Sequence, residues 1–74
     1  MIEGYITQSE VVEWLDITLM SVYRWRREGM PWYRLGYNIL FDPCEVREWV
    51  KKYKRFDPGI YQERIGSYRL VRHN

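Results

Sequence analysis

Two short helices with only two residues between them constrain this chain more than any other feature. Thr7 and Glu10 form a capping-box pattern, in which two side chains satisfy free N–H groups at the start of a helix. Apolar residues follow at helical spacing and predict a first helix over about residues 8–15. Thr18 can cap a second helix. Residues 16–17 leave room only for a tight turn, so the two helices must cross at a large angle.

The second helix has a marked end as well as a marked start. Gly29 is the residue type that most readily adopts the positive φ with which many helices end. Ahead of it, Val22 and Trp25 lie three residues apart and can share a buried stripe. Arg24 and Arg27 lie on a face roughly 140–200° around the helix from Val22, at about 100° per residue. The helix can therefore anchor one side in a core and present cations on the other.

The arginine face of this second helix has two interpretations. A recognition helix in the major groove of DNA divides its residues in the same way. The alternative is a solvated basic face, which is the commoner role of helical arginines. The net charge of +2 is too small to indicate a nucleic-acid partner. Its distribution is more informative, because residues 1–17 carry four acidic and no basic side chains, whereas residues 18–41 carry four arginines and one glutamate.

A β-hairpin is predicted after the second helix. The Met-Pro pair that follows the helix blocks its continuation and favours extended backbone. Residues 32–35 and 39–41 are rich in strand-forming side chains, and the Gly36-Tyr37-Asn38 segment between them has the composition of a hairpin loop. Trp32 and Tyr33 are adjacent, so a strand that alternates its sides cannot bury both rings. One of the two is therefore a candidate contact residue.

A third helix is predicted to open at residue 42. Asp42 is its cap, Pro43 occupies the first helical position, where proline is tolerated, and Glu45 completes a second capping box. Charged residues take one face of this helix. Apolar residues at helical spacing take the other, which we expect to be buried: Val46, Trp49, Val50 and Tyr53.

The order of elements predicts the fold class. Helix, tight turn, helix, hairpin and helix follow one another, and a hairpin after a helix-turn-helix is a wing. We therefore expect a mainly α fold with a small β hairpin (α+β), a winged helix-turn-helix of three helices and a two-stranded wing, over residues 1–54. Residues 55–74 form a C-terminal tail that we expect to be a short β element or a docked arm. Its apolar residues would stay exposed to water if the tail did not pack on something: Tyr61, Ile65, Tyr68, Leu70 and Val71.

The sequence offers no set of residues typical of a catalytic or metal site. Cys44 and His73 are each the only residue of their type, so no internal disulfide and no Cys/His cluster can form. We expect Cys44 to have a packing role. We expect no enzymatic activity, no cofactor, no metal and no small-molecule substrate. The absence of a long apolar run or signal-peptide pattern predicts no membrane association, and a single thiol suits a cytoplasmic location.

An ordered series of spaced residues runs through residues 5–54. It consists of Ile6-Thr7, Glu10-Val11, Leu15-Asp16-Ile17-Thr18, Ser21-Val22-Tyr23-Arg24-Trp25, Arg27-Glu28-Gly29-Met30-Pro31, Tyr33-Arg34-Leu35-Gly36, Phe41, Glu45-Val46 and Trp49. In order and spacing this series resembles the small winged-helix proteins of the excisionase and MerR-like group. It is also similar to the DNA-binding end of lambda-type phage terminase small subunits. There, a Gly-Met-Pro follows the second helix and an aromatic-Asp pair opens the third.

The resemblance implies which residues contact DNA. The family uses the start and the exposed face of the second helix, which correspond here to Ser21, Arg24 and Arg27, with Tyr23 reaching the backbone. Leu19 and Met20 depart from the family, which often has a basic or small polar residue at these positions. The whole set of candidate DNA-binding residues is Thr18, Ser21, Tyr23, Arg24, Arg27, Arg34, Tyr37 and Asn38.

The expected wing also departs from the family, which usually has Arg or Lys after the glycine. This chain has Tyr37 and Asn38 instead. Asn38 can still read a minor-groove edge, and Tyr37 can pack on a sugar.

Three functions are consistent with these features. The first is sequence-specific binding of double-stranded DNA of the excisionase type, in recombination directionality or transcription regulation. A recombinase or a second copy of the chain would be its further partner. The second is DNA recognition like that of a phage terminase small subunit. The third is a protein-interaction module that reuses the fold through its acidic first helix or aromatic tail.

Overall fold

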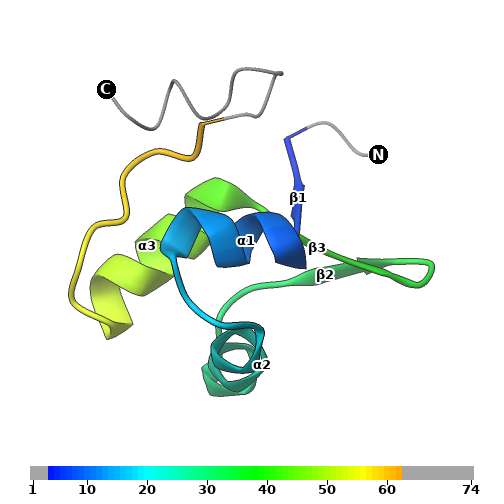
Figure 1. Ribbon diagram of the computed structural model, residues 1–74, viewed down its shortest axis with the longest axis horizontal. Coiled ribbons are helices and arrows are strands. Elements are labelled where there is room, and N and C mark those ends of the chain that lie inside the picture. The colour runs from blue at the N-terminus through cyan, green and yellow to red at the C-terminus, as the bar shows by residue number, and fades with distance from the viewer. Residues whose placement is uncertain (1–3, 63–74) are drawn as a thin grey trace.

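The computed structural model describes residues 4–62, which form an α+β fold of three helices and three short antiparallel strands (Figure 1). The elements follow in the order β1 (Ile6–Thr7), α1 (Gln8–Leu15), α2 (Leu19–Glu28), β2 (Tyr33–Leu35), β3 (Asn38–Phe41) and α3 (Pro43–Tyr53). The three predicted helices and the predicted hairpin are confirmed.

The sheet has one strand more than the expected two-stranded hairpin. β3 is its central strand and pairs with β2 on one side, Leu35 opposite Asn38, and with β1 on the other, Ile6 opposite Phe41. Residues 36–37 alone form the turn of the hairpin, because Asn38 already belongs to β3. The sequence is compatible with a short extended piece at Tyr5 and Ile6, but it did not predict that β1 pairs with β3, because a strand of two residues is too short to show an alternating pattern.

Local hydrogen bonds confirm the start of α1 and the turn after it. The Thr7 N–H donates to Glu10 Oε1 at 2.8 Å, and the Glu10 N–H donates to Thr7 Oγ1 at 3.3 Å, which completes the capping box. Asp16 then takes a left-handed conformation with φ 57°, and its N–H donates to the Val12 carbonyl. The Ile17 N–H donates to the same carbonyl at 3.2 Å, which closes the two-residue turn.

The caps of α2 are those expected from the sequence. Thr18 Oγ1 accepts from the Ser21 N–H at 3.0 Å. Gly29 has a φ of 124°, which side-chain-bearing residues rarely adopt, and its N–H donates to the Trp25 carbonyl at 3.1 Å. The Met30 N–H donates to that carbonyl at 3.0 Å, and the Met30 side chain is fully buried, which the sequence did not indicate.

The start of α3 differs from the expectation in one respect. Asp42 caps the helix and Pro43 opens it, but Asp42 Oδ1 accepts from the Cys44 N–H at 3.0 Å. The expected capping box with Glu45 is not formed. Instead, Glu45 Oε1 accepts from the Tyr33 hydroxyl at 2.8 Å, and this bond raises the pKa of that hydroxyl. A partner brought in by the hairpin thus replaces a purely local one.

All three helices contribute to one core. Its buried side chains are Ile6, Val11, Leu15, Val22, Trp25, Met30, Phe41, Val46, Trp49 and Val50, and Ile17 packs against them from the turn between α1 and α2. The expected buried stripe of α3 is wrong at Tyr53, which is 57% exposed. Tyr53 is the last residue of α3, and its ring lies against Trp49, with the centroids 5.4 Å apart, on the outer side of the core.

The segment after α3 returns along the helices and is fixed at two points. Asp57 forms two hydrogen bonds with the Arg47 guanidinium, at 2.8 and 2.9 Å, and these hold the pKa of the Asp57 carboxyl well below its ordinary value. The Tyr61 ring meets Trp14 edge to face with the centroids 5.5 Å apart. The other apolar residues of the predicted tail, from Ile65 to Val71, lie outside the described residues.

Within residues 4–62, no helix is both long and apolar enough to traverse a bilayer.

Trp49 is the largest side chain that α3 contributes to the core. Replacing Trp49 with Ala should lower the free energy of unfolding by about 3–5 kcal/mol, since the lost burial leaves a cavity. Urea unfolding of parent and variant measures the change, with Tyr53→Ala as the exposed control on the same helix. A loss below about 1 kcal/mol for Trp49→Ala would show that this side chain is not central to the core.

Tyr61 offers a test of the returning segment. Tyr61→Ala should lower the melting temperature, because the edge-to-face contact with Trp14 and its burial are both lost, at about 1–3 kcal/mol. Ile60→Ala is the matched control, since Ile60 is 71% exposed. Equal melting temperatures for the two variants would show that the contact between Tyr61 and Trp14 adds nothing to stability.

Candidate nucleic-acid interface

α2 presents its arginines on the side away from the core. Val22 and Trp25 are buried, whereas Arg24 and Arg27 are exposed, so the two faces deduced from helical spacing are confirmed. Figure 1 shows α2 end-on at the lower edge of the molecule, where its outer face is not covered by another described element.

Three of the predicted site residues are connected at the start of α2. Ser21 Oγ accepts a hydrogen bond from Thr18 Oγ1 at 3.1 Å and a second from Arg24 Nη2 at 3.4 Å. With two bonds accepted, the Ser21 hydroxyl proton remains available for an acceptor outside the protein. The arrangement therefore places a hydroxyl donor beside a guanidinium on the exposed side of the helix.

The arginines of this face, and Arg34 on the hairpin, form no ion pair within residues 4–62. Among residues 4–62, the ion pairs are Arg47–Asp57, Lys51–Glu48 and Lys54–Glu28, and all of their cations lie on α3 or just after it. Arg24, Arg27 and Arg34 therefore have no acidic partner in this part of the chain. An un-neutralised cation attracts an anionic partner over a longer range than a paired one does.

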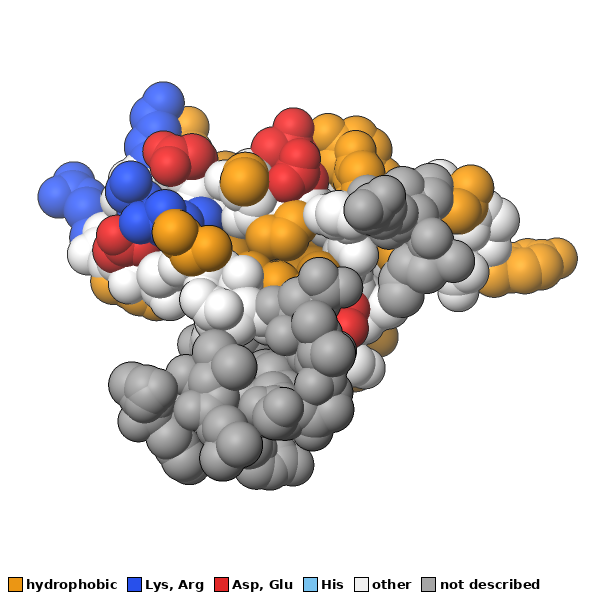
Figure 2. Space-filling model, turned by 90° about the horizontal axis from the view of Figure 1, so that it is seen from above, with side chains coloured by type: hydrophobic (Ala, Val, Ile, Leu, Met, Phe, Trp, Pro, Cys, Tyr) orange, Lys and Arg blue, Asp and Glu red, His pale blue; other side chains and the backbone are white. Residues whose placement is uncertain are grey.

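The opposite face of the molecule has a different pattern of charge. Seen from above in Figure 2, Lys and Arg side chains gather where α3 ends, and acidic side chains lie among them. Two of the three ion pairs, Arg47–Asp57 and Lys51–Glu48, lie within α3 and the segment after it, and the third joins Lys54 to Glu28 at the end of α2. The three pairs cancel most of their own field, and Lys52 and Arg55 are the cations of this region that have no ion-pair partner among residues 4–62.

The hairpin carries the remaining predicted site residues. Arg34, Tyr37 and Asn38 are all exposed, and the Tyr37 side chain at the turn is entirely in solvent. In Figure 1 the hairpin projects to the right, beyond the helices. No hydrogen bond or ion pair within the described residues joins this group to the group on α2. The site residues therefore form two separate sets, on α2 and on the hairpin.

The first residues of α2 are apolar and exposed. Leu19 and Met20 stand beside the capping residues, and Met20 is 68% exposed. Neither can donate a hydrogen bond to a phosphate. Contact with an anion at this end of the helix therefore depends on Thr18, Ser21, the Arg24 guanidinium beside Ser21, and backbone N–H groups.

Arg26 is a candidate that the sequence analysis missed. Its Nη1 donates to Gln8 Oε1 on α1 at 2.9 Å, and its guanidinium lies over the Trp32 ring, 4.3 Å from the centroid. With Tyr23, Arg27 and Trp32 it lines a shallow pocket of about 370 Å³. The only hint in the sequence was three arginines in the four residues 24–27. Their spacing could not show which of them meets α1.

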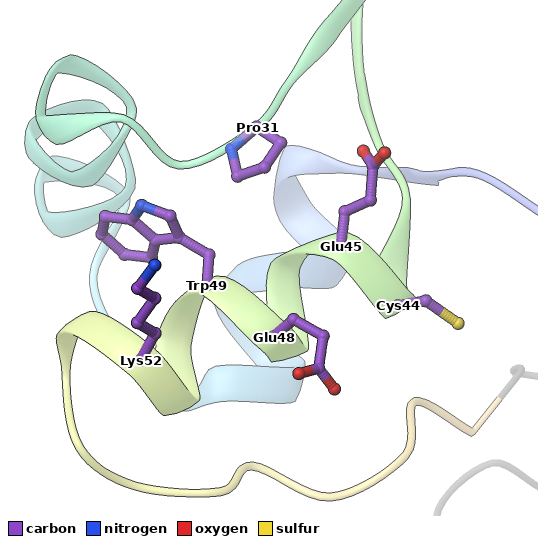
Figure 3. Close-up of a pocket in the computed structure, with 6 residues that line it drawn as sticks. All are labelled: Pro31, Cys44, Glu45, Glu48, Trp49 and Lys52. Carbon is purple, nitrogen blue, oxygen red and sulfur yellow. The ribbon is translucent and has the colours of Figure 1, made fainter.

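A second hollow lies along α3. It measures about 460 Å³ and is lined by Pro31, Cys44, Glu45, Glu48, Trp49 and Lys52 (Figure 3). The carboxylates of Glu45 and Glu48 point to different sides (Figure 3). The expected packing role of Cys44 is wrong, because its side chain is exposed. An apolar floor with acidic residues beside it suits contact with another protein more than chemistry on a substrate.

Comparison with known proteins adds no relative: no protein-family model, curated protein or solved structure matches the chain. Within residues 4–62, no cluster of three His, Cys, Asp or Glu side chains is placed to hold a metal ion.

Proposed function

We propose that this chain binds double-stranded DNA as a winged helix-turn-helix protein. In this proposal α1 and α2 are the helix-turn-helix, α2 is the recognition helix, and the β2–β3 hairpin is a wing to which β1 adds a third strand. The observation that carries the proposal is the outer face of α2, where Arg24 and Arg27 are exposed and lack acidic partners within residues 4–62.

Each exposed residue then has a role suited to its chemistry. Arg24 lies midway along α2, where a helix in the major groove comes closest to base edges, and it can donate two hydrogen bonds to guanine. Arg27 and Arg34 suit phosphate groups. Asn38 suits a minor-groove edge and Tyr37 a sugar. The resemblance to excisionase and MerR-like proteins favours a part in recombination directionality or transcription regulation, with DNA packaging as the alternative.

A protein-interaction module is the second candidate. The groove along α3 supports it, because Pro31 and Trp49 form an apolar surface beside two acidic side chains. Salt separates the two functions, since contacts with DNA phosphates release counterions and apolar contacts between proteins do not.

The affinity for duplex DNA should fall steeply with salt. A log–log slope of roughly −3 to −5 is expected if about four to six phosphates are contacted. Fluorescence anisotropy of a labelled duplex, titrated at several salt concentrations, measures this slope. No binding at low salt, or a slope near zero, would favour the protein-interaction function.

Arg24 and Asn38 should differ in what they contribute. Arg24→Ala should weaken binding to the best site by about 1–3 kcal/mol and reduce the preference for that site over random duplex. Asn38→Ala should cause a smaller loss with the salt slope unchanged, because the side chain is neutral and acts only at short range. Lys51→Ala removes one charge on α3 and is the matched control for Arg24→Ala. Parent-like binding of Arg24→Ala to both duplexes would show that α2 does not read the sequence.

A further inference from the structure

Arg26 is held more firmly than the other arginines of α2. Its Nη1 is bonded to Gln8 Oε1 at 2.9 Å, its guanidinium lies over Trp32, and the Tyr23 ring is 6.0 Å away on its own helix. These contacts come from α1, α2 and the loop before β2. A side chain fixed in this way loses little further conformational entropy when it binds a ligand.

The contacts that fix Arg26 do not neutralise it. Gln8 is uncharged, and within residues 4–62 neither Arg26 nor Arg27 is paired with a carboxylate. Among residues 4–62, the buried Arg26 Nε has no hydrogen-bond partner, and Nη1 makes the one side-chain hydrogen bond of Arg26. Of the five N–H donors of the guanidinium, one is bonded to Gln8 and the Nε proton is buried, which leaves the second Nη1 proton and both Nη2 protons for a ligand.

We propose that Tyr23, Arg26, Arg27 and Trp32 form a binding site for one phosphodiester group of the DNA backbone. This inference rests on the proposed function and extends it, by giving the recognition helix a phosphate clamp beside its base-reading residue. Arg26 and Arg27 supply the positive charge and Tyr23 a hydroxyl donor. Gln8 and Trp32 are positioning residues, which hold the Arg26 guanidinium in place.

The shape of the pocket favours a backbone phosphate over a free nucleotide. The pocket is shallow and open, so it can receive a group that projects from a larger molecule but cannot enclose a small one. Arg26 covers one face of the Trp32 ring, 4.3 Å from the ring centroid, so a nucleobase cannot stack on the side of the ring that carries the guanidinium. A planar guanidinium can donate two parallel hydrogen bonds to the two free oxygens of a phosphodiester. Such contacts position a helix in the groove without reading sequence.

The test compares Arg26→Gln, Arg26→Lys and the control Lys51→Gln with the parent chain on specific and random duplexes over a range of salt. Arg26→Gln should weaken binding to both duplexes by the same factor, about three- to tenfold, and reduce the magnitude of the log–log salt slope by about 1. Arg26→Lys should keep the slope but lose affinity, because an ammonium cannot form the two parallel bonds. Unfolding curves establish that each variant is folded. If Arg26→Gln does not fold, Arg26→Lys alone still tests the phosphate site.

Three outcomes would overturn the phosphate site while the parent still binds DNA. They are a parent-like slope and affinity for Arg26→Gln, a loss confined to the specific duplex, and parent-like affinity for Arg26→Lys. A titration with inorganic phosphate at constant ionic strength shows whether the pocket also binds free anions. The indole N–H resonance of Trp32 follows binding. The duplex should shift this resonance and millimolar phosphate should not; a shift with phosphate alone would contradict the proposal. If the parent does not bind duplex DNA, the proposed function itself fails.

Discussion

The contact between Trp25 and Trp49 determines how α2 is held, and the position of every proposed contact residue on α2 depends on it. The two ring centroids are 5.9 Å apart, and both side chains are buried. The Lys54 ammonium lies over both rings and also pairs with Glu28 at 2.7 Å, which connects the end of α2 to the end of α3. A rotation of α2 about its axis would break this contact. The face that carries Arg24 is therefore kept toward solvent by packing on the opposite side of the same helix.

The distribution of ion pairs follows from this arrangement. α3 and the segment after it contain both acids and bases, and two acids pair locally: Glu48 with Lys51 and Asp57 with Arg47. α2 has one acid, Glu28, at its last position, and this residue is drawn toward Lys54. A net charge of only +2 is thus compatible with a concentrated positive surface, because most of the acids lie elsewhere.

Features set by neighbouring residues were predictable from the sequence, and features set by distant ones were not. The caps at Thr7, Thr18 and Gly29 depend on residues within one helical turn, and each was predicted. Arg26 is different, because its hydrogen bond to Gln8 spans 18 residues and its aromatic partner Trp32 comes from a loop. For the same reason the sequence predicted a local bond for Glu45, whereas the fold brings a tyrosine hydroxyl to it. The candidate site was therefore predictable along one helix, but not across elements.

In the proposed DNA complex, the hairpin and α2 would act over different ranges. The turn of the hairpin carries the uncharged Tyr37, so it adds little to long-range attraction, and the only cation of the hairpin is Arg34 on β2. α2 has three arginines, one fixed by α1 and two exposed. Long-range attraction would therefore bring α2 to the DNA first, and the hairpin would contribute only after docking, when shape and hydrogen bonding decide the energy.

Since the hairpin shares its central strand with β1, and β1 leads directly into α1, its direction is tied to the helices that orient α2. The base of the hairpin and α2 would thus approach a duplex as one rigid unit, although no bond between described residues joins their contact surfaces.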